Sequence, residues 1–166
     1  MALRARRSLL GLGLAGLLSG CGFQLRRPMP LPWQRIALSG FAVRSPFPEA
    51  IRRELPDTAR LVERPSEAQV QVVALEDKLH RTVVASTAAG QVTEFRLRVR
   101  LRFRFTTPGG QPLGPDAELE QVRDLSYAET SALGKETEEL GLLREMRADI
   151  ARQLLQRLAA VGQPAP

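Results

Sequence analysis

A strict alternation of apolar and basic residues runs from Val92 to Thr106. Side chains of a β-strand point alternately to its two faces, so this pattern predicts a strand with one apolar face and one cationic face. A helix could not separate the two kinds of residue, because helical neighbours lie three and four positions apart. At ~3.3 Å per residue the strand is about 50 Å long. The apolar positions are Phe95, Leu97, Val99, Leu101, Phe103 and Phe105, and the cationic positions are Arg96, Arg98, Arg100, Arg102 and Arg104.

Three other segments also have the composition of strands. Alternation within the longest of them slips near Val72 and Val73, which predicts a β-bulge or a change of face at that point. Small residues with Gly90, and the run Thr107-Pro108-Gly109-Gly110, predict turns that join the last three strands into an antiparallel meander. The three segments are Arg35–Ser39, Gln69–Val84 and Ala117–Leu125.

Two segments have the apolar spacing of helices. The first begins at Ser45-Pro46 and ends before Pro56, with Phe47, Ile51 and Leu55 on one face. The second is predicted from Thr137 to Ala160, with acidic residues at its start, as the helix dipole favours. Its apolar stripe consists of Leu143, Met146, Ile150, Leu154, Leu158 and Val161.

These elements predict a two-layer α+β domain with a four-stranded, mostly antiparallel sheet. Both helices are expected to cover the apolar face, which leaves the arginine face open. The first strand, joined through a helix, is expected to lie parallel at one edge. On the last strand, Glu118 and Glu120 are placed to face the arginines. Since two acids cannot neutralise five arginines, we expect positive charge to remain on that face.

The first twenty residues do not belong to this domain. Arg4, Arg6 and Arg7 precede a short apolar run that is too short to span a bilayer, as in an export signal. Leu18-Ser19-Gly20-Cys21 resembles the lipobox of bacterial lipoproteins, which implies a diacylglycerol and an N-acyl chain on Cys21 and no other cofactor. Anchoring would then need no transmembrane helix. Gly22, in place of an aspartate retention signal, favours the outer membrane.

The predicted organisation is therefore a signal peptide at 1–20, a lipidated cysteine and proline-rich tether at 21–34, a domain at 35–161 and a loose tail at 162–166. Prolines in the tether favour extended backbone. Trp33, at its end, is expected to pack against the edge of the domain.

Composition argues against an enzyme. Cys21 is the only cysteine and His80 the only histidine, which disfavours zinc sites and Cys/His nucleophilic pairs, and no phosphate-binding glycine loop is present. The chain has 24 basic and 18 acidic residues, and loss of the three arginines of the signal leaves a net charge of only +3. Such mild charge on an exported protein gives no reason to expect nucleic-acid binding.

The chain resembles the LptE family of lipopolysaccharide-assembly lipoproteins. The resemblance rests on the order strand, helix, three strands, helix, and on short matching runs. These runs are Cys21-Gly22-Phe23-Gln24-Leu25-Arg26, Gly90-Gln91 before Glu94-Phe95, Ala132-Leu133-Gly134-Lys135-Glu136, and Arg144-Glu145-Met146.

This resemblance implies a non-catalytic protein that sits in the lumen of the outer-membrane β-barrel LptD, supports its assembly, and helps deliver lipopolysaccharide to the outer leaflet. It also implies lipopolysaccharide binding through basic residues near loop ends. Lys135, in the loop before the last helix, matches one such position. A second position falls at 87–89, where this sequence has no basic residue, and Arg81 is a possible substitute.

Three interpretations of the arginine face stay open: contact with a polar barrel lumen, simple solvation that protects the sheet, or direct contact with lipopolysaccharide phosphates. A second hypothesis for the whole protein also stays open. It is a free-standing outer-membrane lipoprotein that binds an anionic envelope polymer.

Overall fold

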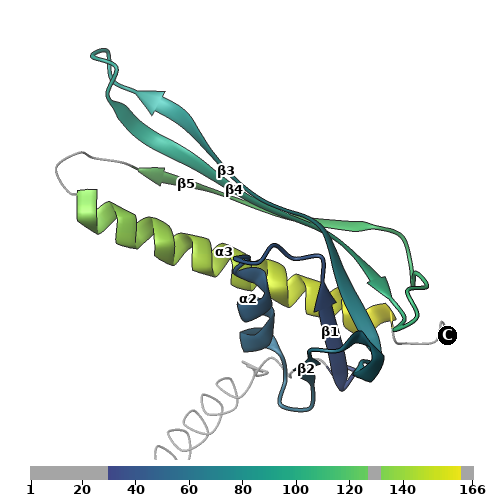
Figure 1. Cartoon of the computed structure of the whole chain (residues 1–166). Helices are drawn as coiled ribbons and strands as arrows, with labels where there is room; N and C mark the ends of the chain where they lie inside the picture. The colour runs from purple at the N-terminus through teal and green to yellow at the C-terminus, as the bar shows by residue number, and fades with distance from the viewer. Residues whose placement is uncertain (1–29, 127–131, 162–166) are drawn as a thin grey trace, which may run out of the picture.

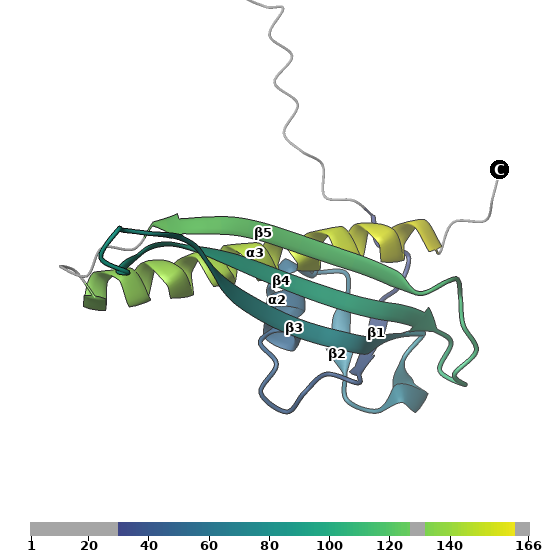
Figure 2. The same cartoon turned by 90° about the horizontal axis from the view of Figure 1, so that it is seen from above.

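A computed structural model describes residues 30–126 and 132–161 of the chain. Figure 1 shows a long twisted sheet with both α-helices on one side of it, and Figure 2 shows the same arrangement from above. The elements are β1 (Arg35–Ser39), α2 (Phe47–Glu54), β2 (Arg60–Val62), the 3-10 turn η2 (Pro65–Glu67), β3 (Val70–Ser86), β4 (Val92–Thr106), β5 (Ala117–Ser126) and α3 (Ala132–Val161).

The sheet has five strands in the order β2-β1-β3-β4-β5 and is mixed. β1 runs parallel to both β2 and β3, whereas β3, β4 and β5 form the predicted antiparallel meander. The prediction of four strands was therefore wrong, and β1 lies inside the sheet instead of at its edge. The missed strand, β2, is only three residues long, so it has no readable alternation and forms through pairing with β1.

The apolar face of β4 forms the centre of the core, as predicted. Leu97, Val99, Leu101 and Phe103 are almost fully buried, and the layer opposite them is made by the apolar stripes of α2 and α3. Burial of a large apolar side chain contributes about 1.5–3 kcal/mol. The helical residues of the core include Phe47, Ile51, Leu143, Met146, Ile150, Leu154 and Leu158.

A β-bulge at Leu75 reverses the faces of β3. Val72 and Ala74 point into the core before the bulge, whereas Asp77 lies opposite Leu101, on the helix-facing side, after it. The bulge thus lies at Leu75, not near Val72 and Val73, and the sequence prediction of its position was wrong. Because strand faces alternate, this extra residue moves Glu76 and the next even positions to the outer face, beside the arginines.

Gly40, directly after β1, packs against the backbone of β3 at Ala74, the residue before the bulge. Its φ is +75°, and a Cβ atom at this position would lie 2.2 Å from the carbonyl oxygen of Ala74. Only glycine fits such a close approach with a positive φ. The start of α2 is held nearby, where the Ser45 hydroxyl donates to Asp77 at 2.5 Å.

The helix α3 begins earlier than predicted, at Ala132 instead of Thr137, and it ends at Val161. At its far end the Trp33 indole Nε1 donates to the carbonyl oxygen of Leu158 at 3.1 Å. The prediction that Trp33 packs on the domain is confirmed. The predicted signal peptide, Cys21, most of the tether and the tail lie outside the described residues. No helix within the described ranges is long and apolar enough to cross a membrane.

Candidate functional site: a paired arginine face and an amphiphilic end

The five arginines of β4 lie on the face of the sheet opposite to the helices, and each has an acidic neighbour. We call this set the arginine ladder. Arg96 pairs with Asp124 through two contacts of 2.7 and 2.8 Å, and Arg104 Nε lies 2.5 Å from Asp116. Arg98 lies 3.2 Å from Glu120, and the remaining pairs are Arg100 with Glu76 and Glu118, and Arg102 with Glu118.

The arginines of this face meet more acids than expected, although Lys78 on β3, opposite Arg100, keeps one cation in excess of the acids around the ladder. Glu118 and Glu120 face the arginines as predicted, but Glu76, Asp116 and Asp124 join them, so five carboxylates meet five guanidinium groups. Asp124 belongs to the predicted strand and could have been found by extending its alternation. The contribution of Glu76 depends on the bulge at Leu75, which the sequence does not place correctly.

The pKa shifts follow from this pairing. The hydrogen bond from Arg96 and its charge hold the pKa of Asp124 below its ordinary range, and Arg104 does the same for the pKa of Asp116. Burial acts to raise the pKa of Glu76, but a hydrogen bond from Lys78 and the charge of Arg100 make the net direction downward. All three carboxylates therefore stay ionised at neutral pH.

The middle of the ladder is the most enclosed part of this face. Glu76 Oε1 lies 2.6 Å from Arg100 Nη2, and Lys78 Nζ lies 3.4 Å from the other oxygen of Glu76. The contact between Glu76 and Arg100 is ionic but poorly aligned for a hydrogen bond. Glu76 Oε1 and Arg100 Nε are both buried without a hydrogen-bond partner among the described residues. An incoming anion would have to displace this carboxylate.

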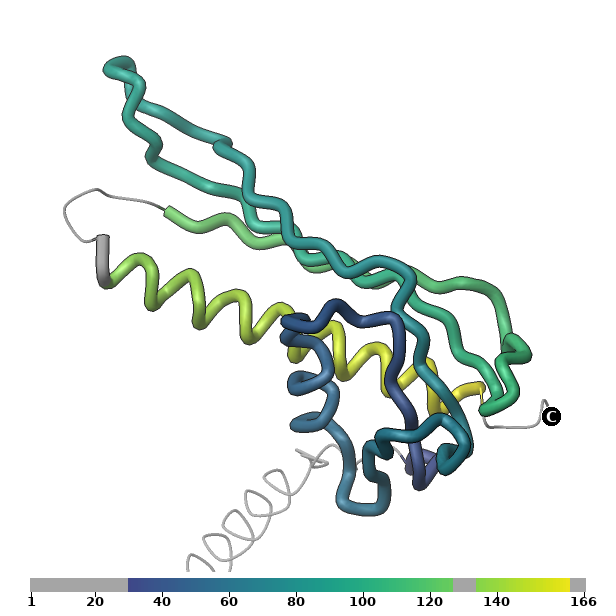
Figure 3. The backbone as a smooth tube through the Cα atoms, viewed as in Figure 1, coloured from purple at the N-terminus to yellow at the C-terminus, as the bar shows by residue number. Residues whose placement is uncertain are grey.

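A second group of sequence-predicted site residues lies where the β3–β4 hairpin meets the start of α3. The guanidinium carbon of Arg81 lies 3.7 Å from the centre of the Phe95 ring and its Nη2 lies 3.4 Å from Glu139. Lys135 Nζ lies 2.7 Å from Glu138, on the first turns of the same helix. Lys135 is thus helical, and the prediction that it belongs to a loop was wrong. Figure 3 shows that this hairpin and the start of α3 lie at one end of the molecule.

Exposed apolar side chains surround this group, which we call the amphiphilic end. Leu79 and Val83 lie opposite Val99 and Phe95, on the helix-facing side of the hairpin, with exposed fractions of 45% and 48%. Leu140 lies one turn before the buried Leu143 and is 55% exposed. In Figure 1 the hairpin rises away from the start of α3 in this region, where Leu79, Val83 and Leu140 are exposed.

The two cations of the amphiphilic end, Arg81 and Lys135, were expected from the family resemblance, but its apolar part was not. Leu79, Arg81 and Val83 are every second residue of β3, so they share one face of the strand. This spacing would have identified the apolar part if that face had been known to lie on the helix side. The turn at 87–89, where a basic residue was missing, lies at the tip of the hairpin and is closed by Thr87 and Gln91 backbone groups at 2.8 Å. Within the described ranges, no three His, Cys, Asp or Glu side chains gather as a metal site requires.

Comparison with known proteins agrees with this fold. Residues 33–158 match the family model of LptE, which is described as lipopolysaccharide-assembly. Among curated proteins no match was found.

Similar solved structures carry lipoprotein names. The solution structure of an uncharacterized lipoprotein B from Nitrosomonas europaea has a TM-score of 0.69 and 22% identity, covering 84% of this chain and 91% of that one. Rare lipoprotein B from Shewanella oneidensis has a TM-score of 0.62 and 23% identity, covering 76% and 95%. A minor lipoprotein from Acinetobacter baumannii has a TM-score of 0.64 and 18% identity, covering 81% and 100%. At these identities the likeness shows a shared fold.

Proposed function

The chain belongs to the LptE family of lipopolysaccharide-assembly proteins, and from this premise we propose that it is the non-catalytic lipoprotein partner of an LptD β-barrel. In this role it would be anchored in the outer membrane through Cys21, occupy the lumen of the barrel as a plug, and support assembly of the barrel. It would also help to deliver lipopolysaccharide to the outer leaflet. The family assignment itself carries the lipopolysaccharide-assembly role.

The observation that most supports direct contact with lipopolysaccharide is the amphiphilic end. Arg81 and Lys135 provide cations for the phosphates of lipid A, and the exposed side chains of Leu79, Val83 and Leu140 provide apolar surface for its acyl chains. Arginine binds phosphate through two parallel hydrogen bonds, and lysine binds it as a point charge. An amphiphile needs both kinds of surface within one site.

The acids around these two cations also suit a reversible site. Glu139 and Glu138 hold Arg81 and Lys135 in ion pairs whose members are all at least partly exposed. Exposed ion pairs contribute only about 0–1 kcal/mol, so phosphate can replace the carboxylates at small cost. In the arginine ladder, by contrast, several contacts would have to be broken together. We therefore place lipopolysaccharide at the amphiphilic end, and not on the ladder.

Copurification tests the proposed partner. The tagged full-length protein, extracted from its own outer membrane in a gentle detergent, should carry one large β-barrel in equal amount. The complex should migrate as one band on an unheated gel and separate on heating, with mass spectrometry identifying both chains. Recovery of the lipoprotein alone would contradict the plug role. It would favour the alternative, a free-standing lipoprotein that binds an anionic envelope polymer.

A further inference from the structure

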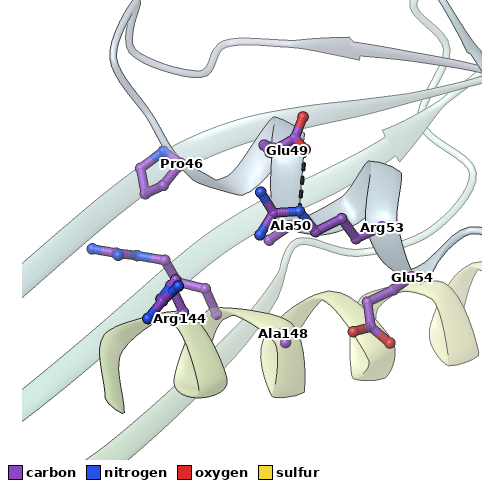
Figure 4. A pocket seen from close by; sticks show the side chains of 8 residues that line it. Pro46, Glu49, Ala50, Arg53, Glu54, Arg144 and Ala148 are labelled. Atoms are coloured by element: carbon purple, nitrogen blue, oxygen red, sulfur yellow. Dashed lines mark hydrogen bonds and ion pairs between the residues drawn. The ribbon is translucent and has the colours of Figure 1, made fainter. Parts of the chain in front are cut away.

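A cavity of about 260 Å³ lies between α2 and α3, and the proposed function does not use it. Its apolar walls are Pro46 and Ala50 on the α2 side and Ala148 on the α3 side. Figure 4 shows Arg144 at one end of the lining and Glu54 at the other. The volume is below the roughly 300–1,000 Å³ of pockets for drug-sized ligands, so the cavity suits one headgroup with a short stem.

The acids of the cavity already have partners. Glu49 accepts hydrogen bonds from Arg52 at 2.8 Å and from Arg53 at 3.1 Å, and these contacts lower its pKa. Glu54 forms an ion pair of 3.1 Å with Arg152, which reaches it from α3. The pairs of Glu49 lie within α2, and the pair of Glu54 links α2 to α3. Neither carboxylate therefore neutralises Arg144 or Arg147.

Arg144 and Arg147 are the cations that remain. Arg144 Nε makes a long contact, 3.3 Å, to the carbonyl oxygen of Leu140. Burial lowers the pKa of the Arg147 guanidinium, and the charge of Asp77 offsets this only in part. Asp77 in turn accepts a hydrogen bond from the hydroxyl of Ser45. Within the described part of the chain, neither arginine forms an ion pair with a carboxylate.

We propose that this cavity binds one carboxylate group carried on a short aliphatic stem, with Arg144 and Arg147 holding the carboxylate and Pro46, Ala50 and Ala148 contacting the stem. With Glu49 and Glu54 already paired, Arg144 and Arg147 are the two cations of the lining left to bind a ligand, and together they favour an anionic group. The planar fork of arginine fits a carboxylate in bidentate fashion. A partly desolvated guanidinium without an ion pair gains most from such a ligand.

The test is an NMR titration of the full-length protein in nonionic detergent, following the side-chain Nε–H signals of its arginines. Hexanoate should shift the signals of Arg144 and Arg147 saturably, with a dissociation constant of about 1 mM, as expected for a ligand of this size. Acetate, which has the charge without the stem, and 1-hexanol, which has the stem without the charge, should each bind at least tenfold more weakly. Equal shifts with hexanoate, acetate and inorganic phosphate would show general anion attraction and overturn the proposal. Binding of N-acetylglutamate amide as tight as that of hexanoate would also support the proposal and would identify an acidic side chain of a protein partner as the source of the carboxylate.

Variants localise the site. Arg147→Met and Arg144→Met should each weaken hexanoate binding about tenfold or more, whereas Arg157→Met, on the same helix but outside the cavity, should leave it unchanged. Ala148→Leu fills the cavity without changing any charge and should also abolish binding. If an arginine variant does not fold, which thermal unfolding measurements would show, the Ala148→Leu variant still tests the proposal. Unchanged hexanoate binding by folded Arg147→Met and Ala148→Leu proteins would overturn the proposal.

Discussion

Glu76 Oε1 lies 2.6 Å from Arg100 Nη2, although the strand register places Glu76 opposite Arg102 and Lys78 opposite Arg100. The carboxylate therefore reaches diagonally between two arginines of the ladder, and Lys78 approaches it from its own strand. This position exists only because the bulge at Leu75 turns Glu76 outward. A cationic strand is thereby converted into a face on which charges of both signs are paired.

The paired carboxylates make stability depend on acidic pH. The pKa values of Asp116 and Asp124 are depressed in the folded protein, so their stabilisation is fully present above the unfolded aspartate pKa of about 3.9 and is lost as the pH falls through the lower folded values. We expect the free energy of unfolding to fall steeply below about pH 4. Asp124→Asn and Asp116→Asn should flatten that pH dependence in urea unfolding series. Asp57→Asn, outside the ladder, should keep the wild-type slope, and a common slope for all three would contradict the pairing.

Gly40 should tolerate no side chain. Gly40→Ala forces a Cβ atom to within 2.2 Å of the Ala74 carbonyl oxygen in addition to the cost of φ near +75°. We expect a loss of roughly 3 kcal/mol or more in the free energy of unfolding. Gly90→Ala is the matched control, because Gly90 has a φ of +81° but open space around it, so only about 1–2 kcal/mol should be lost. Equal losses would show that the close approach to β3 is unimportant.

Charge reversal at the amphiphilic end should weaken lipopolysaccharide binding. Arg81→Asp and Lys135→Asp each remove a proposed phosphate contact, of a kind that contributes about 1.5–3 kcal/mol, so affinity should fall about tenfold or more at fixed salt. Arg44→Asp, in the exposed loop before α2, makes the same change of charge elsewhere and should have little effect. Titration with purified lipopolysaccharide measures all three. A reduction shared by the Arg44 variant would indicate only a net-charge effect.

The arginine ladder should not be required for the barrel complex. Because Arg98 and Arg102 are already paired with Glu120 and Glu118, we expect a protein carrying both Arg98→Gln and Arg102→Gln to copurify with the barrel in the wild-type ratio. The heat-modifiable band on the gel provides the readout. If the complex were lost while the variant stayed folded by circular dichroism, the ladder would have to contact the lumen directly.

The hydrogen bond between Trp33 and the end of α3 should help to fix the tether to the domain. Trp33→Phe keeps most of the apolar contact but removes the Nε1 donor to Leu158. We expect a loss of about 1 kcal/mol in the free energy of unfolding, the usual contribution of such a hydrogen bond. Cleavage by a protease within 21–34 should also become faster. A wild-type cleavage rate together with unchanged stability would show that the indole contributes only through its surface.

Many of the local features could be predicted from the sequence, because they depend on short-range periodicity. The alternation from Val92 to Thr106 is compatible only with a β-strand, so the bounds of β4 and its buried face were predicted correctly. The prolines around α2 fixed its ends in the same way. The three-residue strand β2 was missed because its formation depends on a backbone partner that is distant in the chain.

The features of the candidate site can be divided in the same way, into those that follow from local sequence and those that depend on contacts between distant residues. The sequence by itself determined the cationic alternation and the apolar stripe of α3, since both follow from residue identity and spacing, whereas Arg81 and Lys135 were selected through the resemblance to the LptE family. Only the tertiary structure decided that the ladder is paired, that Arg81 and Lys135 lie at one end with exposed Leu79, Val83 and Leu140, and that Arg144 and Arg147 line a cavity. The physical reason is that the pairing of opposite charges and the shape of a cavity both depend on which residues lie close together in space. A single bulged residue, Leu75, decides which side chains of β3 become those neighbours.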